Sequence, residues 1–188
     1  MKSNAALERG ELMNERILVV YFSRSGRTRS LALAVAESLH CDIEEIAERR
    51  SRTGVFGSMR SGWEAVRERP AVIDAPTHHP ASYDLVVIGT PVWAGAMSSP
   101  VRAYLTVTEA QLRDVVFFCT LGGFGARRAF EQMLGVAGKA PRAVCYARQI
   151  DMESGAHRER VASFAKALAP ATTEHEAARP STPPPATG

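Results

Sequence analysis

Cysteine is scarce in this chain, and no apolar run is long enough to span a membrane. The 188 residues include three cysteines, Cys41, Cys119 and Cys145, which lie far apart in the sequence. This spacing argues against a disulfide framework and a metal site, and favours small buried side chains in a reducing compartment. No stretch approaches the roughly 20 apolar residues of a membrane helix, and residues 1–16 lack the apolar core of a secretory signal. We therefore expect a cytoplasmic protein with no integral membrane segment.

The chain also lacks a large excess of positive or negative charge. The formal net charge is only +3, and the apolar content of 45% and charged content of 23% are typical of a globular protein. Arginines gather between residues 48 and 70, but glutamates separate them and aromatic residues do not alternate with them. We interpret this segment as a solvated face and expect no nucleic-acid partner.

Five strand-like apolar runs alternate with helix-like segments along the chain. The runs cover residues 17–22, 41–46, 85–90, 115–120 and 143–147, and the candidate helices cover 27–39, 58–69, 99–106, 126–137 and 155–168. This alternation predicts a parallel sheet joined by right-handed crossovers, with helices on both faces. The run 85–90 is almost wholly apolar, as expected of a central strand, whereas 41–46 is more polar and fits an edge. The fold class is therefore a doubly wound, three-layer α/β sandwich.

The turn after the first strand combines hydroxyl groups with a glycine and leads directly into a helix. It comprises Ser23, Arg24, Ser25, Gly26, Arg27 and Thr28. Free backbone N–H groups and the positive end of the helix dipole make such a turn a site for a phosphate. It matches neither the triphosphatase loop nor the dinucleotide fingerprint, and it contains no lysine, which favours phosphate binding over phosphoryl transfer. The alternative is an ordinary turn in which Ser25 or Thr28 caps the helix.

Two further turns join glycines to a large aromatic residue. In a doubly wound sheet a ligand binds beyond the carboxyl ends of the strands, where the strand order reverses. The turn after the third strand contains Thr90, Pro91, Val92, Trp93, Ala94 and Gly95, and the turn after the fourth contains Thr120, Leu121, Gly122, Gly123, Phe124 and Gly125. Glycines allow close backbone approach, and an aromatic at the tip can cover a planar ring. A phosphate at one end and a planar ring at the other describe flavin mononucleotide (FMN), although Trp93 alone could be a packing residue.

With these three turns in order, residues 16–168 resemble the flavodoxin-like FMN-binding family. Residues 23–28 are similar to that family's Thr-x-Thr-Gly-x-Thr phosphate loop, and residues 89–95 and 122–125 look like its two loops around the flavin ring. The resemblance implies a five-stranded sheet in the order 2-1-3-4-5. It also implies FMN as cofactor, held by all the turn residues named above.

The resemblance implies redox chemistry but does not name the electron donor or acceptor. Flavodoxins that carry electrons are typically acidic, whereas this chain is basic, and Arg24, Arg27 and Arg29 crowd the phosphate loop. The chain looks closer to the NAD(P)H:quinone oxidoreductases, which would take electrons from NAD(P)H or a redox protein and pass them to a quinone. Two alternatives stay open, a non-enzymatic carrier with the same cofactor and a cofactor-free phosphate-binding or interaction protein on this fold. An oligomer is also possible. No acid or base side chain is needed, so we name no catalytic residue.

The ends of the chain differ in composition from its middle. Residues 1–14 and 170–188 contain few large apolar side chains, and the latter segment is rich in proline and alanine. Such segments are typical of disordered extensions. We therefore expect one folded domain over residues 15–169.

Overall fold

The computed structural model of the chain describes residues 15–49 and 71–168. The expected extension 1–14, the candidate helix over 58–69 with Trp63, and the expected tail 170–188 lie outside the described residues.

In the described part of the chain, five parallel strands form the sheet in the spatial order β2-β1-β3-β5-β6. Their bounds are β1 Ile17–Tyr21, β2 Asp42–Glu45, β3 Leu85–Trp93, β5 Asp114–Leu121 and β6 Val144–Arg148. A sixth strand, β4 (Ala96–Met97), pairs antiparallel with the end of β3. Counting the parallel strands alone, this is the expected order 2-1-3-4-5, with 85–90 at the centre and 41–46 at an edge.

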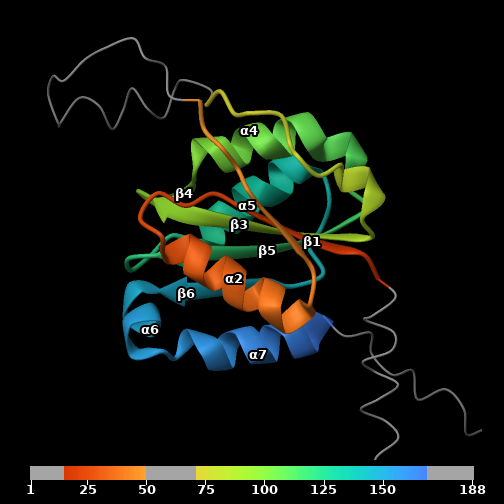
Figure 1. Ribbon diagram of the computed structural model, residues 1–188. Coiled ribbons are helices and arrows are strands. Elements are labelled where there is room, and N and C mark those ends of the chain that lie inside the picture. Colours follow the sequence, from red (N-terminus) through yellow and green to blue (C-terminus); the bar gives the residue numbers. More distant parts are fainter. Residues whose placement is uncertain (1–14, 50–70, 169–188) are drawn as a thin grey trace, which may run out of the picture.

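Helices cover both faces of this sheet (Figure 1). Two helices, α2 (Arg27–Leu39) and α7 (His157–Leu168), lie on one face, and α4 (Ser99–Thr108) and α5 (Ala126–Ala137) lie on the other. Shorter elements complete the described part: η1 (Pro80–Ser82), η2 (Glu109–Gln111) and α6 (Gln149–Ser154). The predicted three-layer architecture is confirmed. Among the described residues, no helix has both the length and the apolarity to cross a membrane.

The two-residue period of the strands divides the core into two layers. Leu18, Val20 and Phe117 face α4 and α5, whereas Val19 and Phe118 face α2 and α7. All five side chains are fully buried. A strand buried on both faces must be apolar at every position, which explains the unbroken apolar runs of β1, β3 and β5.

Element ends differ from the expected ones where tertiary contacts extend or divide a segment. Strand β3 runs to Trp93 and not to residue 90, because Pro91 aligns with Thr120 of β5 and Val92 with Met97 of β4. The expected helix 155–168 begins at His157, and α6 precedes it, separated by Gly155 in a left-handed conformation (φ +80°). Helices α2 and α5 begin and end where the pattern predicts.

Candidate functional site at the carboxyl edge of the sheet

The register of the sheet brings three loops to one edge. Tyr21, the last residue of β1, aligns with Gly89 of β3, and the next N–H along the chain, that of Phe22, donates to the Gly89 carbonyl at 3.2 Å. Gly89 in turn aligns with Phe118 of β5. The loops that follow β1, β3 and β5 therefore leave the sheet side by side.

The first loop ends at a glycine in the left-handed backbone conformation, which favours glycine over other residues. Gly26 has φ +86° and is the N-cap of α2, and no side chain caps the helix. Its own N–H donates to the Ser23 hydroxyl at 3.2 Å, which closes the turn. Because no side-chain hydrogen bond caps α2, neither Ser25 nor Thr28 is its cap, and Ser25 is exposed. An uncapped helix start beside the Ser23 and Ser25 hydroxyls presents hydrogen-bond donors to an anion.

Thr28 differs from the other residues of this loop because it is buried. Its side chain is 2% exposed, and its Oγ1 lies 2.8 Å from Oγ1 of Thr120, near the end of β5. The two residues are 92 positions apart in the sequence. This contact joins the first loop directly to the third.

The arginines around the first loop have different partners. Arg24 lies over the ring of Trp93, with its Cζ 5.8 Å from the ring centroid. Arg29 forms an ion pair with Glu45 at the end of β2, and Glu45 raises the pKa of its guanidinium. Arg27 is exposed. The arginines of this loop are thus not equivalent: Arg29 is held at the β2 side, and Arg24 is directed toward the second loop.

The second loop is the tight hairpin between β3 and β4, which the sequence did not predict. Ala94 and Gly95 occupy its turn with φ +46° and +75°, the geometry of a two-residue hairpin turn. The hairpin is braced from α5, because the Gln132 side chain accepts from the Met97 N–H at 3.0 Å. Trp93 is half-buried and meets the ring of Phe22 edge-on at 5.9 Å between centroids. Trp93 therefore packs on the core and also borders the loop edge.

Thr90 and Pro91 belong to the strand and not to the loop tip. Both are buried, and the Thr90 hydroxyl accepts from the Ser98 N–H at 3.0 Å and lies 3.1 Å from the Ser98 hydroxyl. These bonds hold the base of the hairpin. Thr90 supports the second loop from inside the protein, and Ser98 is a supporting residue that the sequence pattern did not single out.

The third loop is exposed to solvent at its tip and packs against the second loop at its last residue. Leu121 is buried, whereas Gly122 and Gly123 are exposed and have free space around them. Phe124 is 78% exposed, an unusual environment for a large aromatic residue. Gly125 has φ +102° and lies against Gly95, so the second and third loops touch.

The predicted site residues thus form one continuous edge with two kinds of member. Ser25, Gly122, Gly123 and Phe124 are exposed, whereas Thr28, Thr90 and Thr120 are buried. Thr28 and Thr120 connect the first loop to the third, and Thr90 supports the second loop. The donor set fits a phosphate, because hydroxyls and an uncapped helix start converge at Gly26. In the part of the chain that the structure describes, no group of His, Cys, Asp or Glu could hold a metal ion.

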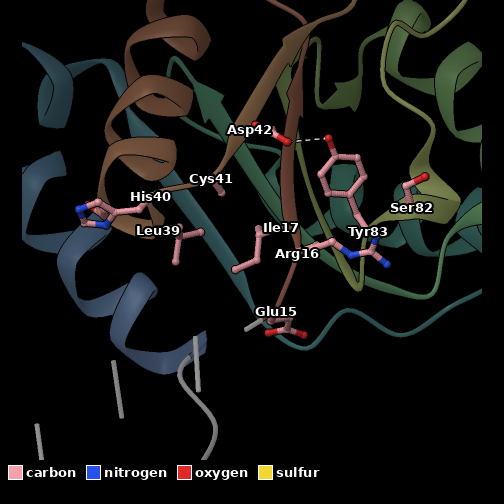
Figure 2. A pocket seen from close by; sticks show the side chains of 10 residues that line it. Glu15, Arg16, Ile17, Leu39, His40, Cys41, Asp42, Ser82 and Tyr83 are labelled. Atoms are coloured by element: carbon pink, nitrogen blue, oxygen red, sulfur yellow. Dashed lines mark hydrogen bonds between the residues drawn. The ribbon is translucent and has the colours of Figure 1, made fainter. Parts of the chain in front are cut away.

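A pocket lies at the opposite edge of the sheet, near the amino ends of the strands (Figure 2). Ile17, Leu39, Cys41 and Asp42 line it, together with Tyr83, whose hydroxyl donates to Asp42 Oδ2 at 2.7 Å. Burial and this bond raise the pKa of Tyr83 to about 12. None of the three loops contributes to the pocket.

Comparison with protein families gives one match that covers most of the chain. The flavodoxin family model matches residues 16–154, which include all three loops. No curated protein matches the chain.

Solved structures of flavoproteins share the fold at low sequence identity. A flavoprotein of Lactobacillus acidophilus, described in complex with FMN, is 20% identical with a TM-score of 0.60, over 76% of this chain and 97% of its own. A putative flavoprotein of Bacteroides uniformis is 21% identical with a TM-score of 0.63, over 81% of this chain and 98% of its own. One of Bacteroides eggerthii is 22% identical with a TM-score of 0.61, over 78% and 95%. At these identities the likeness concerns the fold.

Proposed function

The chain belongs to the flavodoxin family, and on that premise we propose that it binds FMN at the carboxyl edge of its sheet. The observation that carries the proposal is the uncapped start of α2 at Gly26, in a loop that meets the ends of β3 and β5. A flavoprotein of the same fold is described in complex with FMN. The family model spans the three loops that this ligand would need.

The phosphate is assigned to residues 23–28. Ser23 and Ser25 offer hydroxyl groups, the first turn of α2 offers backbone N–H groups, and Arg27 offers positive charge. Hydrogen bonds to a charged acceptor are about twice as strong as neutral ones. A phosphate monoester at this position would therefore contribute much of the binding free energy, and a flavin without phosphate should bind more weakly.

The flavin ring is assigned to the second and third loops. The exposed groups there are Ala94, Gly122, Gly123 and Phe124, with half-buried Val92 and Trp93 beside them. A planar ring can stack on an aromatic side chain, and small residues let backbone N–H groups reach its edge. When bound, FMN supplies the redox chemistry, and the protein supplies position and electrostatics.

We further propose that the protein is an FMN-dependent oxidoreductase of the cytoplasm. It would take electrons from NAD(P)H or a redox protein and pass them to a quinone-like acceptor. The support is electrostatic: the net charge is +3, and Arg27 and Arg128 are exposed at the starts of the two helices that follow the first and third loops. A positive rim raises the local concentration of an anionic donor.

The test begins with the absorbance spectrum of the purified protein and titration of the apoprotein. We expect tight binding of FMN and at least tenfold weaker binding of riboflavin, because riboflavin lacks the phosphate. A protein that purifies colourless and does not bind added FMN would show that the fold serves another function. The holoprotein is then mixed with NADPH and a quinone. Oxidation of NADPH without any added reductase supports the oxidoreductase, whereas its absence favours a non-enzymatic electron carrier.

A further inference from the structure

The contact between Thr28 and Thr120 places two hydroxyls in the interior beneath the first loop. Thr28 is 2% exposed and Thr120 is 6% exposed. Their Oγ1 atoms are 2.8 Å apart, a normal O–H···O distance. Only one of the two protons lies between the oxygens, and either residue can be the donor. The second proton must point elsewhere.

Three other hydroxyl residues in the described helices bond to a carbonyl one turn earlier in the chain. Ser30 donates to the carbonyl of Gly26, Thr106 to that of Arg102, and Thr108 to that of Tyr104, each four residues earlier. Thr28 is the second residue of α2, so the residue four positions before it lies outside the helix. Among the described residues, the hydrogen-bond partner of its hydroxyl is Thr120. Thr28 is therefore bonded across the protein and not along its own helix.

Thr120 is held by the sheet. It lies one residue before the end of β5, aligned with Pro91 of β3 and Ala147 of β6. Pairing on both sides fixes the backbone, and a β-branched side chain has few rotamers in a strand. The hydroxyl of Thr120 is thus presented to Thr28 by a strand that is paired on both sides.

We propose that Thr120 is a positioning residue that donates its proton to Thr28 and thereby directs the Thr28 proton to the phosphate of the ligand. This inference rests on the proposed function, because it needs a phosphate monoester at residues 23–28. A phosphate accepts and does not donate, so it selects the arrangement in which Thr28 is its donor. Thr120 must then donate to Thr28, and the chain runs from Thr120 through Thr28 to the phosphate. Successive hydrogen bonds polarise one another, so the outer bond is strengthened by the inner one. Thr120, expected from the sequence as part of a ring loop, would act on the opposite end of the flavin.

The test compares Thr120→Val with Thr120→Ser in titrations of the apoprotein with FMN and with riboflavin. Valine keeps the shape and removes the donor, whereas serine keeps the donor. We expect Thr120→Val to weaken FMN binding about three- to tenfold, as for partial loss of a charge-assisted hydrogen bond. Riboflavin affinity should change less than about twofold, since about 0.4 kcal/mol corresponds to that factor. Thr120→Ser should restore the wild-type ratio of the two affinities.

Thr108→Val serves as the matched control, because Thr108 is also buried and hydrogen-bonded but lies at the far end of α4. It should leave the ratio of FMN to riboflavin affinity unchanged. Equal losses for FMN and riboflavin in Thr120→Val would show a merely structural role and overturn the proposal. An unchanged or higher FMN affinity would overturn it as well. A wild-type protein that binds no FMN would instead refute the proposed function, and this inference with it.

Discussion

The backbones of Gly125 and Gly95 touch where the second and third loops meet. A Cβ atom on Gly125 would lie 2.5 Å from the Cα of Gly95 and 3.1 Å from a methyl group of Val92. Real Cβ atoms are essentially never that close to backbone. The hairpin after β3 and the loop after β5 are thus in direct backbone contact. They can approach this closely because neither Gly95 nor Gly125 has a side chain.

Replacing Gly125 with alanine should damage both stability and flavin binding. The residue has φ +102°, which an L side chain rarely adopts, and the new methyl group would collide with backbone. We expect the apoprotein to lose about 2–4 kcal/mol of unfolding free energy from strain and overpacking together. The matched control is Gly123→Ala, where nothing lies within 4 Å of the new Cβ. Denaturant unfolding that shows the same loss in both variants would contradict the contact.

The centre of the sheet requires a glycine for a different reason. A Cβ on Gly89 would lie 2.0 Å from Cζ of Phe118, inside the fully buried ring of the neighbouring strand. We expect Gly89→Ala to destabilise the protein by about 1–3 kcal/mol through overpacking. Gly135→Ala offers the contrast, because that glycine lies inside α5 with open space around it. There the exchange should stabilise the protein by about 0.5–1 kcal/mol through helix propensity. Thermal or denaturant unfolding of the two variants measures both effects, which should have opposite signs.

Much of this fold could be predicted from local patterns, because each strand of the sheet carries its own signal. The apolar run of β3 was correctly expected at the centre and the more polar β2 at an edge, whereas the full strand order came from the resemblance to a known family. The start of α2 followed from the turn at Gly26, and the side-chain cap by Ser25 or Thr28, which was the alternative interpretation, is not present in the structure.

The remaining features depend on contacts that no local pattern encodes. The β3–β4 hairpin was missed because its turn is Ala94-Gly95 and not the usual Asn-Gly or Asp-Gly. The ion pair of Arg29 with Glu45 and the hydroxyl contact of Thr28 with Thr120 join residues 16 and 92 positions apart. Composition alone placed Arg29 among the arginines around the phosphate, whereas the fold turns it toward the end of β2.

The buried hydroxyl of Tyr104 should be dispensable for stability. Tyr104 is 1% exposed, and its hydroxyl has no hydrogen-bond partner among the described residues. An unsatisfied buried donor costs about 1–3 kcal/mol, so Tyr104→Phe should leave the unfolding free energy unchanged or raise it by up to about 2 kcal/mol. Tyr83→Phe is the control, because the Tyr83 hydroxyl donates to Asp42 at 2.7 Å and its loss should destabilise. A clear loss of stability in Tyr104→Phe would reveal a partner for that hydroxyl.

Burial of the thiols should make stability decline at alkaline pH. Burial raises the pKa of Cys119 and Cys145, and raises that of the half-buried Cys41 to about 12. In the unfolded chain a thiol ionises near pH 8.5, so above that pH the unfolded state binds fewer protons than the folded state. The contribution of the thiols to the unfolding free energy should be constant up to about pH 8 and should fall as the pH rises further. Urea unfolding between pH 7 and 9, below the ordinary tyrosine pKa of about 10, measures the slope. Cys41→Ala should flatten it, and an identical slope in that variant would show that Cys41 ionises equally in both states.

The positive rim of the site predicts how an anionic donor should respond to charge and salt. Arg128 is exposed in the first turn of α5, directly after the third loop, and forms no ion pair with the residues that the structure describes. If NADPH approaches this edge, Arg128→Ala should slow its reduction of the bound flavin about two- to fivefold at low salt through weaker electrostatic attraction. The difference should shrink as salt rises, because exposed charges are screened over about 10 Å at 0.1 M ionic strength.

Arg113→Ala removes the same charge at the opposite edge, where Arg113 pairs with Asp84 at 2.9 Å, and should leave the rate nearly unchanged. Stopped-flow reduction at several ionic strengths separates the two variants. Equal slowing in both would mean that only net charge matters, and a rate indifferent to salt would favour a donor that does not depend on this rim.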